Sequence, residues 1–360
     1  MPTRLQHNQA PSAARGGGRL GFTLVEVLVV IAIIGLLVGL IVPAVNMAYT
    51  AAKKRAIAME VITLSDAINK YQAKYGDYPP DGSDEGVMKR HFRKIFPQMA
   101  ATEFAILKAG SNASTGVSGA MLDPPEALVF FLGGFSDDPI HPFTGPGGPF
   151  IKSPPDSTAP YQYNLDRNSP LFEFKQGQLS AAVVNDPGSG MPITVSNDET
   201  EFGFATPVGF PGDLIPIYRP SSKQAPFVYF DSRTYATSGG FNRYYAASIG
   251  VARPYKSDSV NTSVTFSPST GDRFYRYAEE KTFQIISAGL DDNYGGIWNQ
   301  MATAIPTFFS FPSGSQVNIT VAPGLQSGPA SYVEAAGTSS MQLDNATNFS
   351  EGVLEDSLEN

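Results

Sequence analysis

The chain has 360 residues, 42% of them hydrophobic and only 16% charged, so it can bury a sizeable core and is long enough for two domains. It contains no cysteine, which excludes a disulfide framework, a thiolate metal site and a cysteine nucleophile. Its formal net charge of -8 argues against a nucleic-acid-binding protein, because contacts to phosphate need clustered lysine and arginine. With 35 glycines and 29 prolines, long and turn-rich connections are expected.

The first 21 residues form a basic segment. It carries Arg4, Arg15 and Arg19 but no acidic residue, and three consecutive glycines at 16–18 make it flexible. These features predict a leader peptide over residues 1–21.

Residues 22–45 form an apolar segment in which Thr23 and Glu26 are the polar exceptions. As a helix, residues 22–43 would span about 33 Å at 1.5 Å per residue, close to the ~30 Å hydrocarbon core of a bilayer. We therefore expect a single membrane-spanning helix. An ordinary secretory signal is the alternative, but this run is longer than a usual signal core. It also places a carboxylate, which costs about 3 kcal/mol when unpaired, near its start.

The junction between these two segments reads GFTLVE and resembles the type IV prepilin N-terminal signature. The resemblance implies that a prepilin peptidase cuts between Gly21 and Phe22 and methylates the new N-terminal residue. It also implies a glutamate close to that terminus, which is Glu26, and a helix-bending proline, which is Pro43. We expect Glu26 and Pro43 to serve filament assembly.

Cleavage at this junction would leave a positively charged amine on Phe22. Within a bundle of low dielectric, Glu26 can neutralise such an amine, which in pilin filaments belongs to a neighbouring subunit. A carboxylate that snorkels to the membrane surface is the alternative. The resemblance implies other pilin-like subunits as partners in a homo-oligomeric filament, besides membrane lipid.

The charges on either side of the apolar segment leave its orientation undecided, because Lys53, Lys54 and Arg55 follow it as closely as the leader arginines precede it. The cleavage signature instead places the C-terminal body outside the cytoplasm. We therefore expect a single-pass inner-membrane protein with a periplasmic body. The three basic residues are expected to solvate a helix face or to contact lipid headgroups.

Residues 46–76 continue the helix with an amphipathic pattern. Apolar residues recur in steps of three and four, the spacing of one helix face. They are Ile57, Val61, Leu64, Ile68, Tyr71 and Tyr75. Gly76, followed by Asp77 and two prolines, predicts the end of the helix. We expect this face to pack into a globular body formed by residues 77–360.

Within the body, Asp123 to Glu126 has the pattern of a helix start, and Gly133 with Gly134 that of a stop, so we predict a short buried helix between them. Aromatic and β-branched runs predict strands of an antiparallel sheet. These runs are residues 161–165, 171–174, 227–231 and 283–288.

Other parts of the body show weaker patterns. Proline and glycine predict an extended connection over residues 139–160. Residues 81–120, 175–225 and 300–340 are interpreted as insertions, the last two with little regular pattern. The expected fold class is α+β and pilin-like, with a long N-terminal helix packed on a small antiparallel sheet and with long loops.

Three segments resemble the major pseudopilin of the type II secretion system: residues 71–81, 283–296 and 344–349. The resemblance implies a long helix, a small antiparallel sheet and a late loop that binds calcium. Ser287, Gly289 and Asp291 match the first part of that loop. Asp344, Asn348 and Phe349 match the second, with Asn345 in place of an expected aspartate.

Calcium prefers six to eight oxygen ligands, and the resemblance assigns four of them to Asp291, Asp344, Asn345 and the carbonyl of Ala288. Two features depart from the family, because about fifty residues separate the two parts and one carboxylate is missing. An ordinary turn is the alternative for the acidic cluster. An EF-hand is excluded, since the twelfth position from Asp291 is Ala302.

An enzyme is not expected. The three histidines, His7, His91 and His141, offer little material for a triad or a zinc site, and no Walker loop or nucleophile elbow is present. Asp137 and Asp138, beside a proline, are interpreted as turn residues and not as a catalytic pair.

Three classes of function remain open. The first is a subunit of a type II secretion pseudopilus, favoured by the C-terminal resemblance, with prepilin peptidase, an inner-membrane assembly platform and other subunits as partners. The second is a major or minor pilin for adhesion, motility or DNA uptake, although a pilin more often carries paired cysteines. The third is a membrane-anchored extracytoplasmic binding protein or enzyme.

Overall fold

A computed structural model describes residues 21–110, 121–204, 211–237, 240–295, 307–320, 332 and 342–358. The chain divides into two compact units, residues 1–51 and 52–360. The predicted leader, apart from Gly21, and most of the insertion predicted at 300–340 lie outside the described residues.

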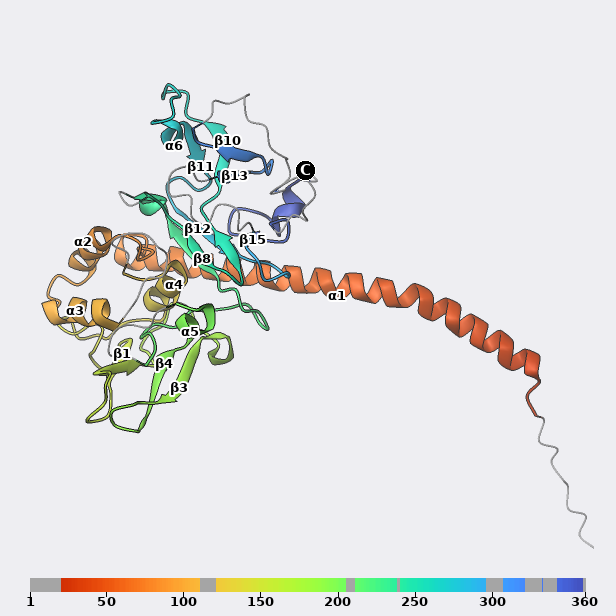
Figure 1. Cartoon of the computed structure of the whole chain (residues 1–360), viewed down its shortest axis with the longest axis horizontal. Helices are drawn as coiled ribbons and strands as arrows, with labels where there is room; N and C mark the ends of the chain where they lie inside the picture. Colours follow the sequence, from red (N-terminus) through yellow and green to blue (C-terminus); the bar gives the residue numbers. More distant parts are fainter. Residues whose placement is uncertain are drawn as a thin grey trace, which may run out of the picture. The chain divides into compact units, whose positions relative to one another are not determined.

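A single long helix, α1, runs from Leu24 to Tyr75 and is continuous through Pro43 (Figure 1). Proline has no N–H to donate to the carbonyl four residues earlier, so Pro43 removes one bond of the helix ladder without ending the helix. The helix ends where Gly76 adopts a φ of 72°, a conformation that favours glycine. The predicted stop is therefore confirmed.

Within the second unit, α1 buries one face. Its buried side chains are Ile57, Ala58, Val61, Leu64, Ala67, Ile68 and Tyr71, while Tyr75 is partly buried. The predicted stripe is thus confirmed as the part of the helix that enters the core of the body. Side chains at these positions line one face because they recur at the helical period.

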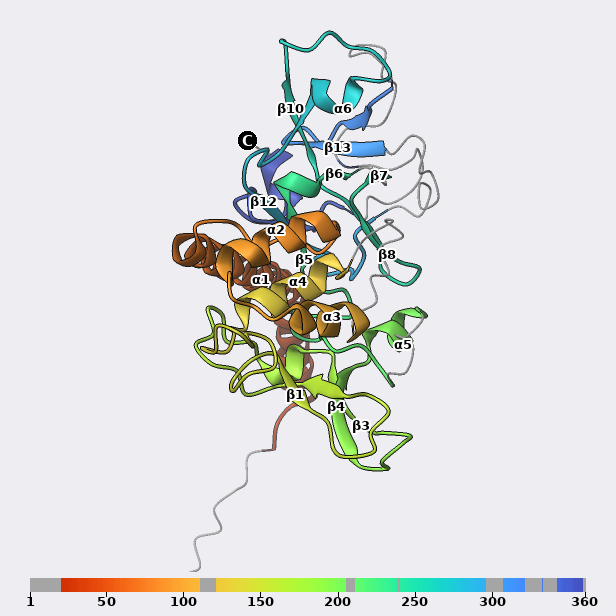
Figure 2. The ribbon, with the colours of Figure 1, turned by 90° about the vertical axis from the view of Figure 1, so that its left-hand side faces the viewer.

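Three further helices pack into the same core. They are α2 (Glu85–Ile95), α3 (Ala101–Gly110) and α4 (Pro124–Leu132). The predicted helix is α4, and all of its residues are buried. Figure 2 shows the three helices side by side. The segment 81–120, which the sequence analysis interpreted as an insertion, contributes Met88, Phe92 and Leu107 to the main core.

The central sheet of the body has three antiparallel strands in the order β15–β12–β5. They are β5 (Val228–Asp231), β12 (Phe283–Ser287) and β15 (Ala346–Thr347). The strands predicted at 227–231 and 283–288 are therefore confirmed. Alternate residues face opposite sides: Tyr229 and Ile285 join the core formed with α1 and α4, whereas Phe230 and Ile286 join a second core.

Short strands and a second sheet complete that second core and form a third, smaller cluster around Tyr275, Phe308 and Val317. The elements are β6 (Ala236–Thr237), β7 (Gly240–Phe241), β8 (Tyr244–Ala246), β9 (Gly250–Ala252), β10 (Lys256–Val260), β11 (Tyr275–Tyr277), β13 (Thr307–Phe311), β14 (Gln316–Asn318), α6 (Gly271–Phe274) and the 3₁₀ turns Ser232–Thr234 and Leu354–Leu358. The second sheet has the order β11–β10–β13–β14, and its β10–β13 pair is parallel. The sequence did not indicate a parallel pair.

The segment between α4 and β5 is more regular than predicted. It contains β1 (Phe150–Lys152) paired with β2 (Tyr161–Tyr163), a 3₁₀ turn at Gln176–Gln178, the hairpin of β3 (Ala181–Asn185) and β4 (Pro192–Ser196), and the short helix α5 (Asp198–Phe202). The prediction of little regular pattern over 175–225 was therefore wrong, and the connection predicted over 139–160 contains the strand β1. The strand predicted at 161–165 is confirmed for its first three residues.

The strand predicted at 171–174 is wrong. The backbone amides of Leu171 and Phe172 donate instead to the carbonyl of Leu132, at the end of α4. The ring of Phe172 lies 5.5 Å from that of Tyr218. Residues of strand-like composition here cover a helix end and satisfy one of its last carbonyls, so no sheet partner is needed.

With these corrections, the α+β fold class is confirmed: a long N-terminal helix packs its C-terminal half against small, mainly antiparallel sheets joined by long loops.

Candidate functional site

The start of α1 is fixed by a reciprocal pair of side-chain bonds. The Thr23 amide and hydroxyl both donate to Oε2 of Glu26, each at 2.8 Å. In return, the Glu26 amide donates to Oγ1 of Thr23 at 3.2 Å. This is a capping box, in which two otherwise unsatisfied N–H groups of a helix start are paired.

The capping box gives Glu26 a second role that the sequence analysis missed. A threonine followed three residues later by a glutamate, just before an apolar run, is the signal that would have revealed it. Both bonds that the Glu26 carboxylate accepts end on Oε2. Among the residues that the structure describes, no hydrogen bond ends on Oε1, so this oxygen can accept from a group outside the chain.

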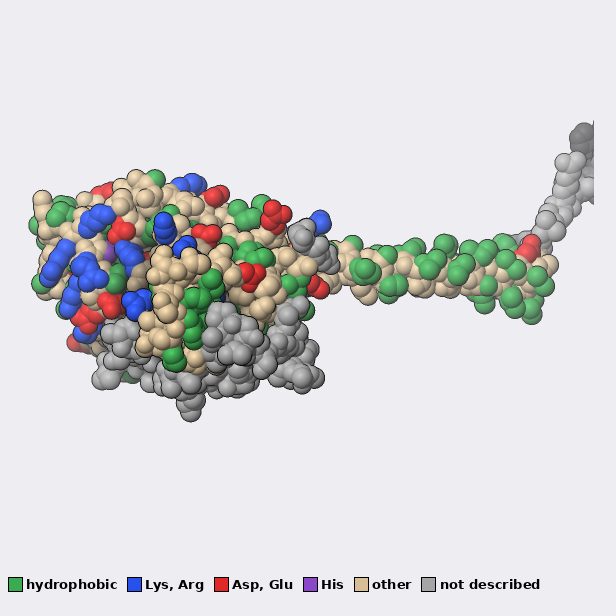
Figure 3. All heavy atoms as spheres, turned by 90° about the horizontal axis from the view of Figure 1, so that it is seen from above, with side chains coloured by type: hydrophobic (Ala, Val, Ile, Leu, Met, Phe, Trp, Pro, Cys, Tyr) green, Lys and Arg blue, Asp and Glu red, His purple; other side chains and the backbone are tan. Residues whose placement is uncertain are grey.

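The N-terminal half of α1 is apolar on all sides. Every residue from 21 to 50 is exposed, and the least exposed large apolar side chain from Phe22 to Tyr49, that of Val29, is still 48% accessible. In Figure 3, hydrophobic side chains line this part of the helix. A helix that is hydrophobic all round needs lipid or partner helices around it.

The same helix is long and apolar enough to cross a membrane, judged by length and composition. Pro43 lies in the apolar part of α1, and Gly21 and Phe22 precede the capping residue Thr23. A cut between Gly21 and Phe22 would leave Thr23 and Glu26, and therefore the capping box, within the mature chain.

The residues predicted to bind calcium come together at the end of β12. Pairing of Ser287 with Ala346 sets the loop that follows β12 beside the loop that precedes β15. Oδ2 of Asp344 accepts the amides of Leu290, at 2.6 Å, and Asp291, at 3.0 Å. Two segments that are about fifty residues apart in the sequence thus form one local structure.

Gly289 permits this close approach. Its φ is 67°, and a Cβ at this position would lie 2.2 Å from the carbonyl oxygen of Asp344. A side chain would therefore force the two loops apart. Ala288 directly precedes it, immediately after the end of β12.

The electrostatics of this loop favour a cation. Burial and the neighbouring Asp344 carboxylate raise the pKa of Asp291 to about 6. Asn345 is fully buried, and its Nδ2 donates to the carbonyl of Tyr294 and to the hydroxyl of Tyr255, each at 3.2 Å. Its Oδ1 has no hydrogen-bond partner among the described residues. Carboxylate and amide oxygens such as those of Asp291, Asp344 and Asn345 are of the type that calcium prefers.

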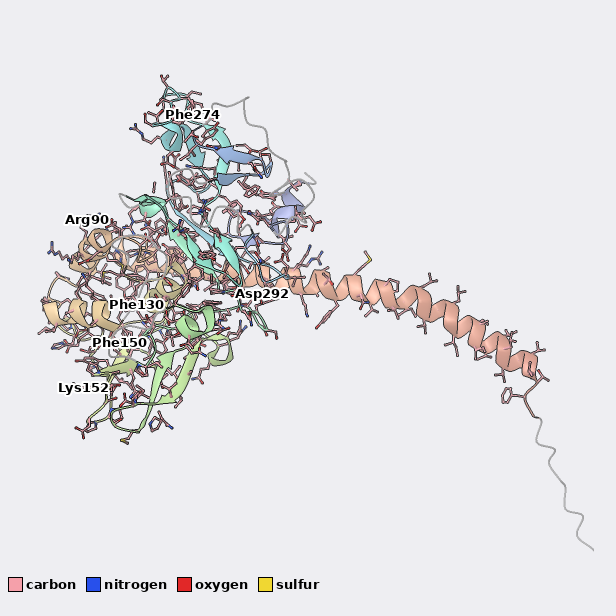
Figure 4. The ribbon with its side chains drawn as sticks, viewed as in Figure 1. Arg90, Phe130, Phe150, Lys152, Phe274 and Asp292 are labelled. Atoms are coloured by element: carbon pink, nitrogen blue, oxygen red, sulfur yellow. The ribbon has the colours of Figure 1, made fainter. Side chains whose placement is uncertain are left out.

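Neighbouring groups limit that site. The Lys223 ammonium donates to the carbonyl of Leu290, so one positive charge already lies at the loop. Asp292, labelled in Figure 4, is engaged elsewhere, because its carboxylate accepts the amides of Gln224 and Ala225.

The two described histidines are structural. Nε2 of His91 lies 2.8 Å from the Tyr71 hydroxyl, and burial lowers the pKa of His91 to about 4. His141 lies at the surface, with Nδ1 3.3 Å from the buried Glu103 carboxylate. Asp138 accepts the amides of Ile140 and His141, which confirms it as a turn residue.

Comparison with known proteins identifies the N-terminal segment. Residues 18–42 match the family model of the prokaryotic N-terminal methylation motif. The chain carries a prepilin-type N-terminal motif. No curated protein and no solved structure shows a significant match. The match covers the processing junction and the apolar part of α1 and says nothing about the body.

This prepilin-type motif implies processing by prepilin peptidase and assembly with other pilin subunits. Together with the apolar start of α1, it indicates a membrane-anchored, single-pass protein of pilin or pseudopilin type.

Proposed function

We propose that this protein is a structural subunit of a type II secretion pseudopilus. It is cut between Gly21 and Phe22, methylated on Phe22 and assembled through the N-terminal half of α1. The observation that carries the proposal is the motif at residues 18–42, which coincides with a capped, exposed helix that is apolar on all sides.

Before assembly, this helix lies in the inner membrane and the body lies in the periplasm. An inner-membrane platform then transfers the helix from lipid to a bundle of identical helices. Both surroundings are apolar, so the transfer leaves the apolar side chains covered throughout. The body does not need to refold, because its own core contains only the second half of α1.

Glu26 supplies the specific contact in that bundle. The amine exposed on Phe22 of one subunit lies next to Oε1 of Glu26 on its neighbour, while Oε2 keeps the capping box intact. Opposite charges attract strongly in a bundle that excludes water, and loss of one partner leaves the other buried and unpaired. This pairing aligns neighbouring subunits along the filament.

A pseudopilus, as opposed to a pilus, is supported by the C-terminal loop. Residues 283–296 and 344–349, which resemble the major pseudopilin, are neighbours in the fold. Calcium held there by Asp291, Asp344, Asn345 and the Ala288 carbonyl would tie the end of β12 to β15. Bound only by the folded chain, the ion would stabilise the body by mass action.

The test uses the full chain with its secretion machinery. Glu26→Ala is combined with Val38→Cys, which introduces a thiol for crosslinking neighbouring helices. The chain has no native cysteine, so this thiol is the only one that can react. We expect normal leader removal, measured by the mass of the mature protein. Crosslinked filaments and secreted cargo should fall at least about tenfold, since breaking a buried ion pair costs about 3–5 kcal/mol.

The matched control is Asp66→Ala, which removes an exposed carboxylate from the body half of the same helix. It should process, crosslink and secrete like the wild type. Normal crosslinking by Glu26→Ala would overturn the charge-pairing mechanism. Loss of surface fibres or twitching with normal secretion would instead identify a type IV pilin.

A further inference from the structure

A cluster of carboxylates lies inside the body, away from the C-terminal loop. Glu126 comes from α4, and Asp198 and Glu199 come from α5. One oxygen from each lies within 4.8 Å of the others, and the three residues are at most 2% exposed. Negative charges in such a place repel one another strongly and are rarely buried without a counter-charge.

Several oxygens of this cluster have no hydrogen-bond donor. Oε1 of Glu126 and both carboxylate oxygens of Glu199 are buried without a partner among the described residues. Oε2 of Glu126 is engaged, since it accepts the Asp123 amide at 2.6 Å. Buried polar atoms are nearly always paired in folded proteins, so three unpaired carboxylate oxygens in one cluster indicate a missing electropositive group.

The surrounding side chains deepen the negative field. Asp123 and Asp213 are buried nearby. Burial is the main reason why the pKa of Glu126 lies well above its usual range, and the negative charges of Asp213, Asp123 and the rest of the cluster raise it further. Burial, then the same neighbours, raises the pKa of Glu199 to about 11. Tyr244, whose buried hydroxyl has no partner, lies in the same field.

Arg219 is a cation that interacts with the cluster, but burial outweighs its effect and raises the pKa of Asp198. Its guanidinium is already paired in a fork with Glu201, at 3.0 and 2.7 Å. Asp198 is partly served by hydroxyl groups, accepting from Ser180 at 3.2 Å and also from Ser196.

We propose that Glu126, Asp198 and Glu199 form a buried binding site for a calcium-sized divalent cation. The donor set is oxygen only, without histidine or cysteine, which selects hard cations over zinc or copper. Two ligands of one ion are separated by at most twice its bond length. This limit is about 5 Å for calcium and about 4 Å for magnesium, so the 4.8 Å cluster suits the larger ion.

Such an ion would join two parts of the body that are far apart in the sequence. Glu126 lies in the first turn of the fully buried α4. Asp198 and Glu199 follow the β3–β4 hairpin, which the sequence analysis treated as an insertion. The cation would therefore fasten this hairpin region to the helical core, and the site is independent of the filament contact of α1.

The test measures bound calcium in the purified full-length protein, desalted after exposure to calcium and analysed for metal content. The C-terminal loop is first disabled by Asp291→Asn with Asp344→Asn. We expect that protein to retain one equivalent of calcium and to lose it when Glu126→Gln and Glu199→Gln are added. Calcium should also raise its Tm by several degrees, and the two glutamine substitutions should abolish that rise.

Terbium gives a second readout with calcium as competitor. Its luminescence, excited through a nearby tyrosine such as Tyr244, should appear in the loop-disabled protein, disappear on addition of calcium, and fall with Tyr244→Phe. The control variant, Glu173→Gln, removes an exposed carboxylate of the same body and should change neither readout.

A loop-disabled protein that holds no calcium and shows the same Tm with calcium and with chelator would overturn the proposal, even if the glutamine variants failed to fold. A higher Tm of the glutamine variants in the absence of calcium, without calcium binding by the parent, would show that the carboxyls share protons instead. Failure of filament assembly would leave both readouts unaffected, so this site and the pseudopilus proposal can fail separately.

Discussion

The two halves of α1 differ in what covers their apolar side chains. In residues 24–51 every side chain is exposed, and apolar residues occupy all sides. In residues 52–75 a single stripe is buried in the core of the body, and the exposed remainder is mixed, with polar and charged residues beside exposed Met59 and Ile62. One continuous helix thus combines a half that depends on other molecules with a half whose partners lie in the same chain.

This contrast explains how a subunit can leave the membrane without unfolding. Burial of apolar area stabilises the body through the second half alone, at about 25 cal/mol per Å². The first half keeps its apolar area for lipid or for neighbouring helices. Substitutions in the second half should therefore change the stability of the body, whereas substitutions in the first half should change assembly. Three predictions use this difference.

The largest effect is expected from cutting a core side chain in the second half. Leu64 is completely buried, so Leu64→Ala leaves a cavity and should lower the free energy of unfolding of the body by about 2–5 kcal/mol. Leu37→Ala, the matched change in the first half, removes a side chain that is 50% exposed and should leave that free energy unchanged. Denaturant unfolding in detergent, followed by near-UV circular dichroism, measures both. Equal losses of unfolding free energy from the two variants would show that both halves of α1 stabilise the body and would contradict the prediction.

The long periodic segments were predictable, since periodicity over many residues reports which side of an element is buried. This holds for α1 and for the apolar strands β5 and β12. The helix α2 was missed although its signals were present: Asp84 caps it, and Val87, Met88 and Phe92 lie on one face. The β3–β4 hairpin was also missed, although a Pro-Gly turn separates its two strands.

Other features cannot be derived from local sequence. The segment 171–174 has strand composition, but its amides bond to the end of α4, a choice made by tertiary contacts. Glu126 and Glu199 are 73 positions apart, and only the packing of α5 near α4 brings their carboxylates together. The pairing of Asp291 with Asp344 was implied by a family resemblance, and the strand register of β12 and β15 supplies its physical cause.

A pH effect of intermediate size should also separate the two halves. His91 is buried against Tyr71 of the second half of α1, and burial lowers its pKa to about 4 from 6.5. His91 therefore becomes protonated below pH 6.5 in the unfolded chain but only below about pH 4 in the folded body. Stability should rise with pH across this window and be lost on acidification, by about 3 kcal/mol in full.

The variant His91→Gln tests this linkage, because an amide can still bond to the Tyr71 hydroxyl but does not titrate. The difference in unfolding free energy between wild type and variant should shift by about 3 kcal/mol between pH 6.5 and 4. The difference reports His91 together with the Asp77 carboxylate 3.3 Å away, whose pKa His91 helps to lower, while groups that do not contact His91 titrate alike in both proteins. A pH-independent difference would show that His91 is protonated in the fold. Helix crosslinking through the first half should not follow this pH dependence.

The smallest effect is expected at the helix start. Thr23→Ala removes the hydroxyl that accepts the Glu26 amide but keeps the backbone N–H that donates to the Glu26 carboxylate. Loss of an N-cap side chain costs about 1 kcal/mol, so amide hydrogen exchange in the first turn of α1 should become about fivefold faster. Since Glu26 keeps its charge, assembly should fall far less than with Glu26→Ala, and Thr23→Ser should restore both exchange and assembly. If Thr23→Ala abolished assembly as completely as Glu26→Ala while exchange remained unchanged, Thr23 would have to contact a neighbouring subunit directly, and the first half of α1 would carry two specific contacts instead of one.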